Sequence, residues 1–181
     1  VRRVTEDLFA FARAGAHPEP GVHTPVGEVV EELLHELQSE IEDAQVTLTV
    51  APFPACSVAC AHGILYSLLS NLLRNAIKYL SDSEVRRITV RVVLEASVIR
   101  VEVADTGPGL PPALLSSVFD AYVRAPGVQQ PGLGLGLATV KRLAETHRGR
   151  VGVQSTLGQG AVFWFELPAA HPTDVSASGE R

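Results

Sequence analysis

The sequence predicts an α+β fold: a two-layer α/β sandwich in which a mixed, mostly antiparallel sheet packs on helices. Two observations support this prediction. Segments rich in β-branched residues come in neighbouring pairs, 88–95 with 98–105 and 150–155 with 161–167. Helical patterns separate these pairs, but without the strict strand–helix–strand alternation of a doubly wound parallel sheet.

The chain divides into four segments. Residues 1–15 repeat apolar residues at a 3-4-3-4 spacing, which is typical of the end of a longer helix in a coiled coil or helical hairpin. Residues 16–27 contain three prolines and indicate a linker. The main domain is expected at 28–168, and the small, polar residues 169–181 are expected to form a disordered tail.

Within the main domain, each element has its own pattern. Residues 28–43 have the apolar spacing of an amphipathic helix, and residues 46–50 alternate as a strand. A long, leucine-rich helix is predicted at 61–80, before the first strand pair, which forms a hairpin. After a stretch rich in glycine and proline, a helix at 135–147 precedes the second strand pair.

Composition restricts the class of protein. The chain has 181 residues, 46% of them hydrophobic, and a formal net charge of −5, which fits one globular domain with short appendages. This charge gives no reason to expect nucleic acid or direct membrane contact. No apolar run reaches the ~18 residues that span a bilayer, so a cytoplasmic location is expected, and a membrane anchor elsewhere in the parent protein stays open. Because the chain lacks methionine and begins at Val1, we expect a fragment of a longer protein.

Cysteines provide no sign of a metal site. Cys56 and Cys60 are the only two, with no second pair and no histidine at zinc-ligand spacing. Both are therefore expected to be buried thiols.

A polar stripe runs along the predicted helix at 61–80. At about 100° per residue, Asn75 and Lys78 lie about 40° and about −20° from Asn71, with the leucines on the opposite arc. An amide oxygen can be one hard ligand of Mg²⁺ whose other positions are filled by phosphate and water, and a lysine can face phosphate charge. For this stripe alone, a solvated polar face is the alternative.

An acidic residue ends the second strand of the first pair. Asp105 has the same parity as the apolar residues of that strand, so its carboxylate is expected to point toward the buried side. Gly107 and Gly109 follow in a tight turn, where a flat ligand can approach the backbone closely. The alternative is an aspartate that caps the turn by accepting its own backbone N–H groups.

Three glycines immediately precede the helix predicted at 135–147. Gly132, Gly134 and Gly136 bring flexible N–H groups and the positive helix end together, which suits phosphate. The segment is neither a Walker loop nor the dinucleotide-binding fingerprint. A flexible hinge is the alternative.

In this order and spacing, the motifs resemble those of the catalytic, ATP-binding domain of bacterial sensor histidine kinases, which are Bergerat-fold ATPases like gyrase and MutL. The match covers roughly residues 28–168. The matching boxes are "NLLRNAIKY" at 71–79, "DTGPG" at 105–109, "VFDAYVR" at 118–124, "GLGLGLA" at 132–138 and "GQG" at 158–160.

The resemblance implies a role for each motif residue. Asp105 would bind the adenine amino group, and Asn75 would bind Mg²⁺. Asn71 would order the phosphate and water network, Lys78 would contact phosphate, and Tyr79 would border the nucleotide pocket. The other ATP-binding residues would be Gly107, Gly109, Phe119, Tyr122, Arg124, Gly132, Leu133, Gly134, Leu135 and Gly136.

A flexible ATP lid would span residues 112–131, with Phe119 as its anchor. Three departures from the family pattern stand out: Leu133 replaces the usual Thr or Ser, "HRG" at 147–149 replaces "HGG", and an Asp usual before the asparagine helix is replaced near Cys60. None of them removes a nucleotide-contact position, so ATP binding is expected.

The implied activity is transfer of the γ-phosphoryl group of Mg-ATP to a histidine on a dimerisation helix of the same dimer. A response-regulator receiver domain would then accept the phosphoryl group. His35 lies in "HELQSE", but a strand-like segment and a Pro-containing stretch before Asn71 leave no room for a returning helix. The phosphoacceptor is therefore expected upstream, and residues 1–15 would end a dimerisation helix. Two alternatives stay open: an ATP-binding regulatory module without phosphoryl transfer, and a serine kinase of the same superfamily.

Overall fold

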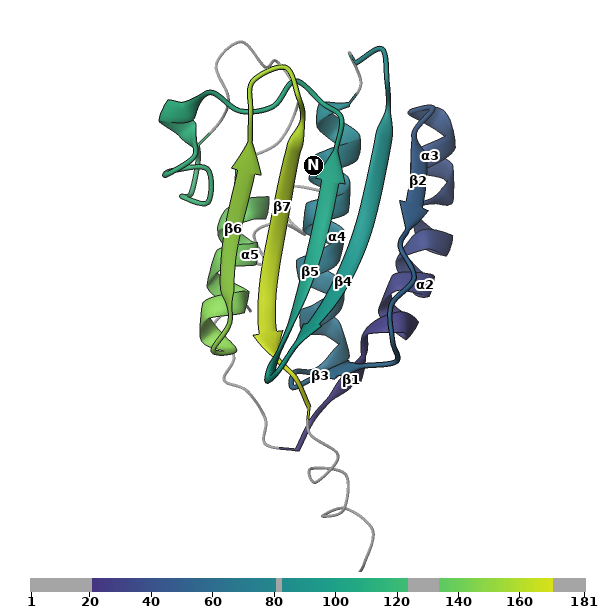
Figure 1. The fold of residues 1–181 in the computed structure, drawn as a ribbon, viewed down its shortest axis with the longest axis vertical. Helices are drawn as coiled ribbons and strands as arrows, with labels where there is room; N and C mark the ends of the chain where they lie inside the picture. The colour runs from purple at the N-terminus through teal and green to yellow at the C-terminus, as the bar shows by residue number, and fades with distance from the viewer. Residues whose placement is uncertain (1–20, 81–82, 124–133, 171–181) are drawn as a thin grey trace, which may run out of the picture.

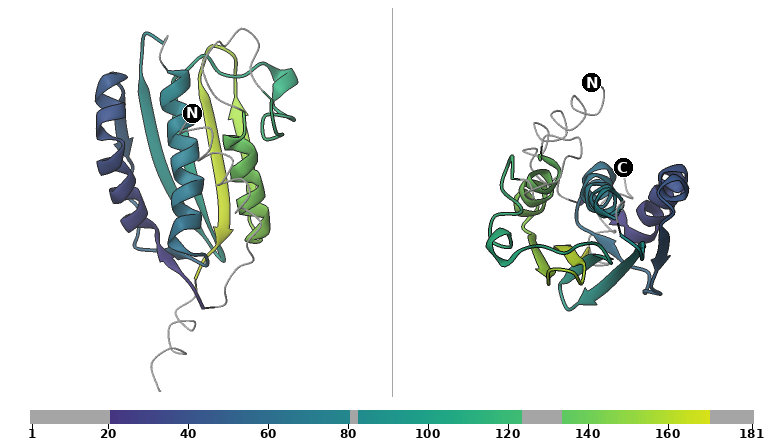
Figure 2. Two further views of the ribbon diagram at one scale, coloured as in Figure 1. Left: turned by 180° about the vertical axis from the view of Figure 1, so that it is seen from behind. Right: turned by 90° about the horizontal axis from the view of Figure 1, so that it is seen from above.

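Helices cover one face of a five-stranded sheet in the computed structural model of the chain, which describes residues 21–80, 83–123 and 134–170 (Figure 1). The covering helices are α2 (Val26–Glu36), α4 (His62–Tyr79) and α5 (Gly136–Thr146). Seen from above, these three helices lie side by side on the same side of the sheet (Figure 2). The predicted two-layer sandwich is confirmed.

The strands follow the order β2-β4-β5-β7-β6 across the sheet. β2 is parallel to β4, and the other neighbours are antiparallel, so the predicted mixed, mostly antiparallel sheet is also confirmed. Each predicted strand pair forms a hairpin, β4 with β5 and β6 with β7. The bounds of the strands are Thr47–Val50 (β2), Arg87–Glu95 (β4), Val98–Asp105 (β5), Arg150–Ser155 (β6) and Ala161–Pro168 (β7).

The core lies between the two layers and follows from the two periodicities. Alternate residues of β5 face the helices and are almost fully buried, while Arg100 and Glu102 point to the uncovered face. The leucines of α4 meet them from the other side, so the long helix turns its polar stripe away from the core. The side chains buried at this contact include Leu65, Leu68, Leu69, Leu72, Leu73, Ile99, Val101 and Val103.

One predicted helix differs from the observed structure. Instead of a single helix at 28–43, α2 begins at Val26 and is followed by a short helix, α3 (Gln38–Asp43), with Leu37 between them. Leu37 has a ψ of 1°, although its N–H still bonds to the Leu33 carbonyl at 2.9 Å. Leu37 is fully buried, whereas α3 has no fully buried side chain and only its Ile41 packs against the core, partly exposed.

Residues at both limits of the domain take part in short backbone pairings. β1 (Thr24–Pro25) pairs with β3 (Ser57–Val58), so residues 24–27, predicted to close a linker, belong to β1 and α2. At the other end, the N–H groups of Ala169 and Ala170 donate to Ser97 and Ser57 carbonyls, so these two residues lie with the domain. The predicted helix at 1–15 and the tail from 171 onwards fall outside the described residues, and the other domain limits stay predictions.

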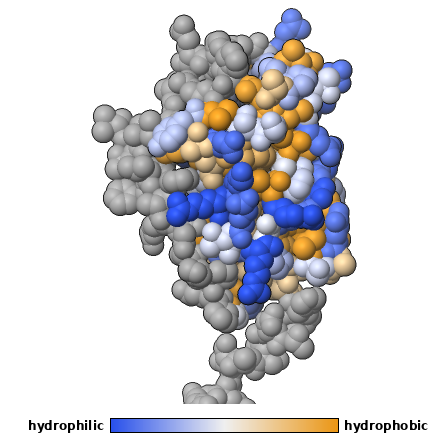
Figure 3. Space-filling view, turned by 90° about the vertical axis from the view of Figure 1, so that its left-hand side faces the viewer, coloured by the Kyte–Doolittle hydropathy of each residue, from blue (hydrophilic) through white to orange (hydrophobic). Residues whose placement is uncertain are grey.

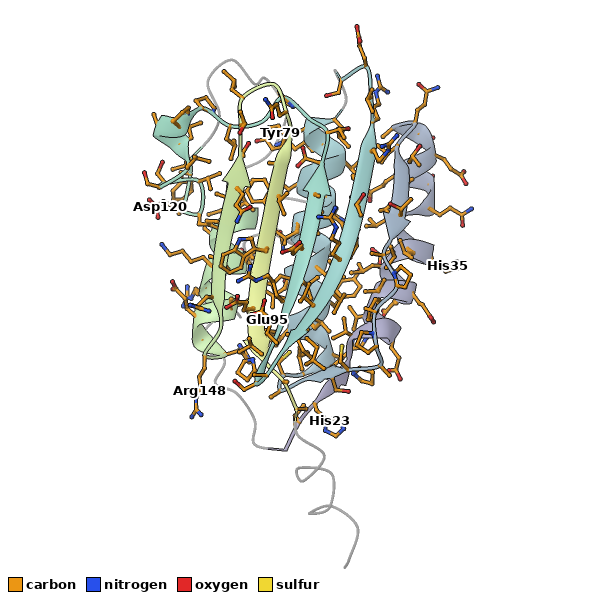
Figure 4. The ribbon with its side chains drawn as sticks, viewed as in Figure 1. His23, His35, Tyr79, Glu95, Asp120 and Arg148 are labelled. Carbon is orange, nitrogen blue, oxygen red and sulfur yellow. The ribbon has the colours of Figure 1, made fainter. Side chains whose placement is uncertain are left out.

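The functional motifs gather at one end of the sheet. α4 and β5 both end there, at Tyr79 and Asp105, and α5 begins beside Asn71, about two turns before the end of α4. The labelled side chains show this polarity: Tyr79 lies at the upper end, while Glu95 and Arg148 lie near the lower one (Figure 4). This upper end therefore contains the candidate site.

Candidate functional site

The acid at the end of β5 meets the last turn of α4. The Gly107 N–H donates to Oδ1 of Asp105 at 2.9 Å. A Cβ at Gly107 would lie 2.9 Å from that oxygen and 3.4 Å from the Tyr79 carbonyl oxygen. Gly107 is buried, and the absence of a Cβ there lets the carboxylate and the end of the helix lie close together.

The carboxylate of Asp105 is largely removed from water. Burial raises its pKa, although backbone hydrogen bonds at Gly107 and Ala161 act in the opposite direction. The turn-capping contact that the sequence left as an alternative is thus present through Oδ1. A half-buried carboxylate of this kind needs hydrogen-bond donors, because an unpaired buried charge is costly.

The asparagine stripe meets the glycine segment at the start of α5. Nδ2 of Asn71 donates to the Ser67 carbonyl at 2.8 Å. Its Oδ1 would lie 3.0 Å from a Cβ at Gly136, the first residue of α5. The first N–H groups of a helix have no intrahelical partner, so Asn71 stands beside a group of available donors. These contacts bring together α4 and α5, two of the elements that the sequence singled out.

The rest of the stripe is half-buried along α4. Asn75, Lys78 and Tyr79 are each of intermediate exposure, which differs from the fully solvated face left open by the sequence. Nζ of Lys78 lies 5.3 Å from the centre of the Tyr79 ring, in cation–π geometry. An amide and an ammonium group are thus held one turn apart near the same end of the helix.

The first part of the predicted lid is fastened to the domain. The ring of Phe119 packs edge-on against Phe163 of β7, with ring centres 6.1 Å apart. Asp120 pairs with Lys141 of α5 at 3.4 Å. The side of the molecule that lies on the left in Figure 1 shows many hydrophilic side chains among apolar ones (Figure 3). The role of Phe119 as an anchor of the lid stays a prediction.

The described ends of the lid region meet each other. The Tyr122 N–H donates to the Gly134 carbonyl at 3.1 Å, and both residues have positive φ, 66° and 70°. The Tyr122 side chain is 70% exposed and Leu135 is 2% exposed, so any contact of Leu135 with a ligand would be through its backbone. Three predicted ligand residues lie outside the described residues: Arg124, Gly132 and Leu133.

Comparison with known proteins decides the family. A model of the histidine kinase-, DNA gyrase B-, and HSP90-like ATPases matches residues 62–171, more than half of the chain. This chain belongs to that ATPase family. The match covers α4, the Asp105 turn and α5, which are the three elements that meet at the site.

Relatives in this ATPase family include sensor kinases. Over 141 residues the chain is 34% identical to the adaptive-response sensory kinase SasA of Synechococcus sp. strain JA-3-3Ab, covering 77% of this chain and 36% of that protein. Over 101 residues it is 39% identical to the sensor histidine kinase AruS of Pseudomonas aeruginosa, covering 53% of this chain and 10% of AruS. The chain therefore spans about a third or less of these two relatives.

Solved structures show the same ATPase-family fold. Full-length ShkA in complex with AMPPNP has a TM-score of 0.77 and 30% identity, covering 93% of this chain and 35% of ShkA. The mycobacterial sensor histidine kinase MprB has a TM-score of 0.68 and 27% identity, covering 82% of this chain and 97% of the MprB chain. Both similarities extend well beyond the individual motifs.

Two side chains at this ATPase-family site were missed by the sequence. Ser155 Oγ accepts from the Leu110 N–H at 2.8 Å and donates to the Gly160 carbonyl at 2.7 Å. Thr106 Oγ1 donates to the Val85 carbonyl at 2.6 Å. A hydroxyl at a strand end carries no distinctive sequence signal, because its partners are backbone groups that only the folded chain brings beside it.

The remaining candidates lie elsewhere in the ATPase domain. His35 is on α2, on the flank of the molecule opposite Asp120 (Figure 4). In the described ranges, no group of three or more His, Cys, Asp or Glu side chains is arranged to hold a metal ion. Within those ranges, too, the helices lack the combined length and apolar composition needed to cross a membrane.

Proposed function

We propose that this chain is the catalytic, ATP-binding domain of a sensor histidine kinase, which transfers the γ-phosphoryl group of Mg-ATP to a histidine on a dimerisation helix of the same dimer. The observation that supports this most strongly is that the Asp105 turn and the start of α5 both lie against the second half of α4. Asp105 lies beside the end of α4 through Gly107, and Asn71 of α4 lies beside Gly136 of α5. Family membership and the similarity to a kinase solved with AMPPNP support the same function.

The adenine end of the nucleotide would bind at the Asp105 turn. A Cβ at Gly107 would lie 2.9 Å from Oδ1 of Asp105, so glycine at this position keeps the carboxylate uncrowded. Asp105 would accept a hydrogen bond from the adenine amino group. Gly107 and Gly109 would let the base approach the backbone, and Tyr79 would border the pocket. A donor that matches this half-buried carboxylate should bind more tightly than a ligand without one, because the carboxylate would otherwise stay without a hydrogen-bond partner.

The phosphates would bind between α4 and the start of α5. The N–H groups at Gly134, Leu135 and Gly136 and the positive end of α5 suit phosphate oxygens. Lys78 would contact a phosphate, and Asn71 would order phosphate and water through Oδ1, since its Nδ2 is engaged by Ser67.

Mg²⁺ would be held with the nucleotide by a single protein ligand, the amide oxygen of Asn75. Such a donor set fits this ion, which keeps several waters and binds phosphate oxygens in preference to an all-protein cage. Bound Mg²⁺ would offset the negative charge of the phosphates. The protein's own contribution is then positioning and charge stabilisation, because phosphoryl transfer needs little covalent help.

The lid residues complete the proposed site. Phe119 would anchor the lid on β7, as its packing on Phe163 supports. Tyr122 and Arg124 would contribute from the lid, and Gly132 and Leu133 from the glycine segment. Proposed partners beyond ATP are the phosphoacceptor helix of the same dimer and a response-regulator receiver domain, and the proposed location is the cytoplasm.

Calorimetric titration with Mg-ATP tests the binding site. Asp105→Asn and Asn75→Ala should each weaken binding by about 10- to 100-fold, since a hydrogen bond or ligand bond involving a charged group is worth ~1.5–3 kcal/mol. Asp43→Asn, at the end of α3, is the matched control and should bind like the wild type. Unchanged affinity in both folded site variants would contradict the assignment.

Phosphoryl transfer needs a separate assay. The chain extended at its N-terminus to include the upstream helix should be incubated with γ-labelled ATP. Acid-labile label on a histidine is the expected result. Acid-stable label would favour a serine kinase, and tight ATP binding without any label would favour a regulatory module; either result would contradict the proposed activity.

A further inference from the structure

We infer that Ser155 is a positioning residue for nucleotide recognition, whose hydroxyl holds the Asp105 turn in the shape that presents its carboxylate to the base. This inference rests on the proposed function. It assigns a role to a residue at the end of β6, fifty positions beyond the aspartate that it would control.

The Ser155 hydroxyl joins two turns that are distant in the sequence. Oγ accepts from the Leu110 N–H at 2.8 Å and donates to the Gly160 carbonyl at 2.7 Å. A hydroxyl has one proton to donate and two lone pairs, so both bonds can form at once. Leu110 ends the turn that follows Asp105, and Gly160 ends the turn between β6 and β7. Ser155 therefore fixes the distance between these two turns.

Backbone contacts transmit this constraint to the aspartate itself. A Cβ at Gly160 would lie 2.0 Å from the Asp105 carbonyl oxygen, so the two backbones touch. A Cβ at Gly109 would lie 2.2 Å from the Thr156 carbonyl oxygen, and the Gly158 N–H donates to the Pro108 carbonyl at 2.7 Å. The whole turn after Asp105 thus rests on the β6–β7 turn.

A second hydroxyl holds the opposite side of the turn. Thr106 Oγ1 donates to the Val85 carbonyl at 2.6 Å and accepts from the Arg87 N–H at 3.0 Å. The turn is therefore clamped before Gly107 by Thr106 and after Gly109 by Ser155. Thr106 is exposed, so water can replace its hydroxyl, whereas Ser155 is half-buried and its partners would be left unsatisfied. Ser155 should be the stronger of the two clamps.

The orientation of the carboxylate depends on the part of the turn between these clamps. Oδ1 of Asp105 accepts the Gly107 N–H, so a shift of Gly107 moves the carboxylate away from the position that suits a base. Without the Ser155 hydroxyl, the Leu110 N–H and the Gly160 carbonyl must find other partners, and the turn relaxes. The resulting loss of binding affinity should come from the contact between Asp105 and the adenine amino group, since the phosphates would bind elsewhere.

The test compares two nucleotides by calorimetry on this chain. The probes are Mg-ATP and purine riboside triphosphate, which lacks the 6-amino group. Ser155→Ala should weaken ATP binding about tenfold and leave the affinity for the analogue unchanged. Ser155→Thr, which keeps a hydroxyl, should restore ATP binding. Thr49→Ala is the control and should change neither affinity. It removes a hydroxyl of the edge strand β2 that is hydrogen-bonded to the Ile88 carbonyl of β4.

A double-mutant cycle tests whether Ser155 acts through Asp105. In an Asp105→Asn background, Ser155→Ala should cause no further loss of ATP affinity. Equal weakening of both nucleotides, or full additivity in the cycle, would overturn the inference, because either result indicates a general structural effect. Should Ser155→Ala fail to fold, Ser155→Cys, with its weaker hydrogen bonding, serves for the same comparisons.

Failure of this inference is distinguishable from failure of the proposed function. If the wild type does not bind Mg-ATP, the proposed function is wrong. If the wild type binds and Asp105→Asn weakens binding while Ser155→Ala does not, only the positioning role is wrong.

Discussion

Replacing Glu166 by glutamine should destabilise the domain. The Glu166 side chain is 2% exposed and lies between Arg100 and Arg150, its register partners on the neighbouring strands, on the sheet face not covered by helices. Oε1 accepts from Nε of Arg100 at 2.8 Å, and Oε2 accepts from Nε of Arg150 at 2.9 Å. Arg100 also stacks on the Trp164 ring at 4.4 Å. In the variant, the new NH₂ group faces a guanidinium, so one acceptor becomes a donor.

The magnitude follows from burial on each side of the contact. Breaking a fully buried ion pair costs ~3–5 kcal/mol. The Arg100 and Arg150 side chains are 25% and 75% exposed, so water can solvate part of what Glu166 releases. We therefore expect a loss of about 2 kcal/mol, reduced for solvent screening. For a chain of this length, such a loss lowers the melting temperature by about 4–8 °C.

Thermal unfolding at pH 7 measures this effect, with Glu102→Gln as the matched control. Glu102 lies on the same sheet face, but its pair with Arg91 spans 3.9 Å and Arg91 is 52% exposed. The control should shift the melting temperature by less than about 4 °C, and by less than Glu166→Gln does, because exposed pairs contribute ~0–1 kcal/mol.

The pH dependence provides a second check of the same contact. Burial raises the pKa of Glu166, but the hydrogen bonds and charges of Arg100 and Arg150 outweigh it, and the pKa is lowered. A lowered folded-state pKa means that the stabilisation is present above the unfolded pKa of ~4.3 and is lost as pH falls through the folded value. The difference between wild type and variant should therefore shrink below about pH 4. Equal melting temperatures at pH 7, or a difference independent of pH, would refute the reasoning.

Three further substitutions probe the site. Gly136→Ala should change the free energy of unfolding by less than about 1 kcal/mol, because the gain in helix propensity offsets the displacement of Asn71, whose Oδ1 would lie 3.0 Å from the new Cβ. Calorimetry should nevertheless show weaker Mg-ATP binding. Unchanged binding would contradict the contact between Asn71 and Gly136. Asp105→Asn should not lower the melting temperature of the nucleotide-free domain. Burial raises the pKa of Asp105, so its negative charge destabilises the fold increasingly as pH rises through that pKa. A marked drop in melting temperature at pH 7 would contradict a destabilising charge. Phe119→Ala should cost about 1–2 kcal/mol through lost packing on Phe163, read from chemical unfolding, and a neutral result would show that the ring does not anchor the lid.

Periodicity predicted the features that depend on local sequence. The parity of Asp105 with the buried residues of β5 placed its carboxylate on the inner side of the strand end, and burial raises its pKa there. The helical spacing of Asn71, Asn75 and Lys78 placed them on one half-buried face of α4. Both predictions needed only the geometry of a single element.

Features that depend on register between distant segments were not predictable. The hydrogen bonds of Ser155 join residues of two turns that meet only when β6 and β7 dock beside β5. The pairing of Glu166 with Arg100 needs the same alignment. The interruption at Leu37 was missed because the apolar pattern continues through it from α2 to Ile41 of α3, so the sequence carries no sign of the local change in ψ.

A crystal structure of this chain with Mg²⁺ and a non-hydrolysable ATP analogue tests the central claim most directly. The account predicts the adenine amino group within hydrogen-bond distance of the Asp105 carboxylate, Mg²⁺ on the Asn75 amide oxygen, and phosphates against the first turn of α5. A nucleotide bound elsewhere, or bound with its base away from Asp105, would contradict it.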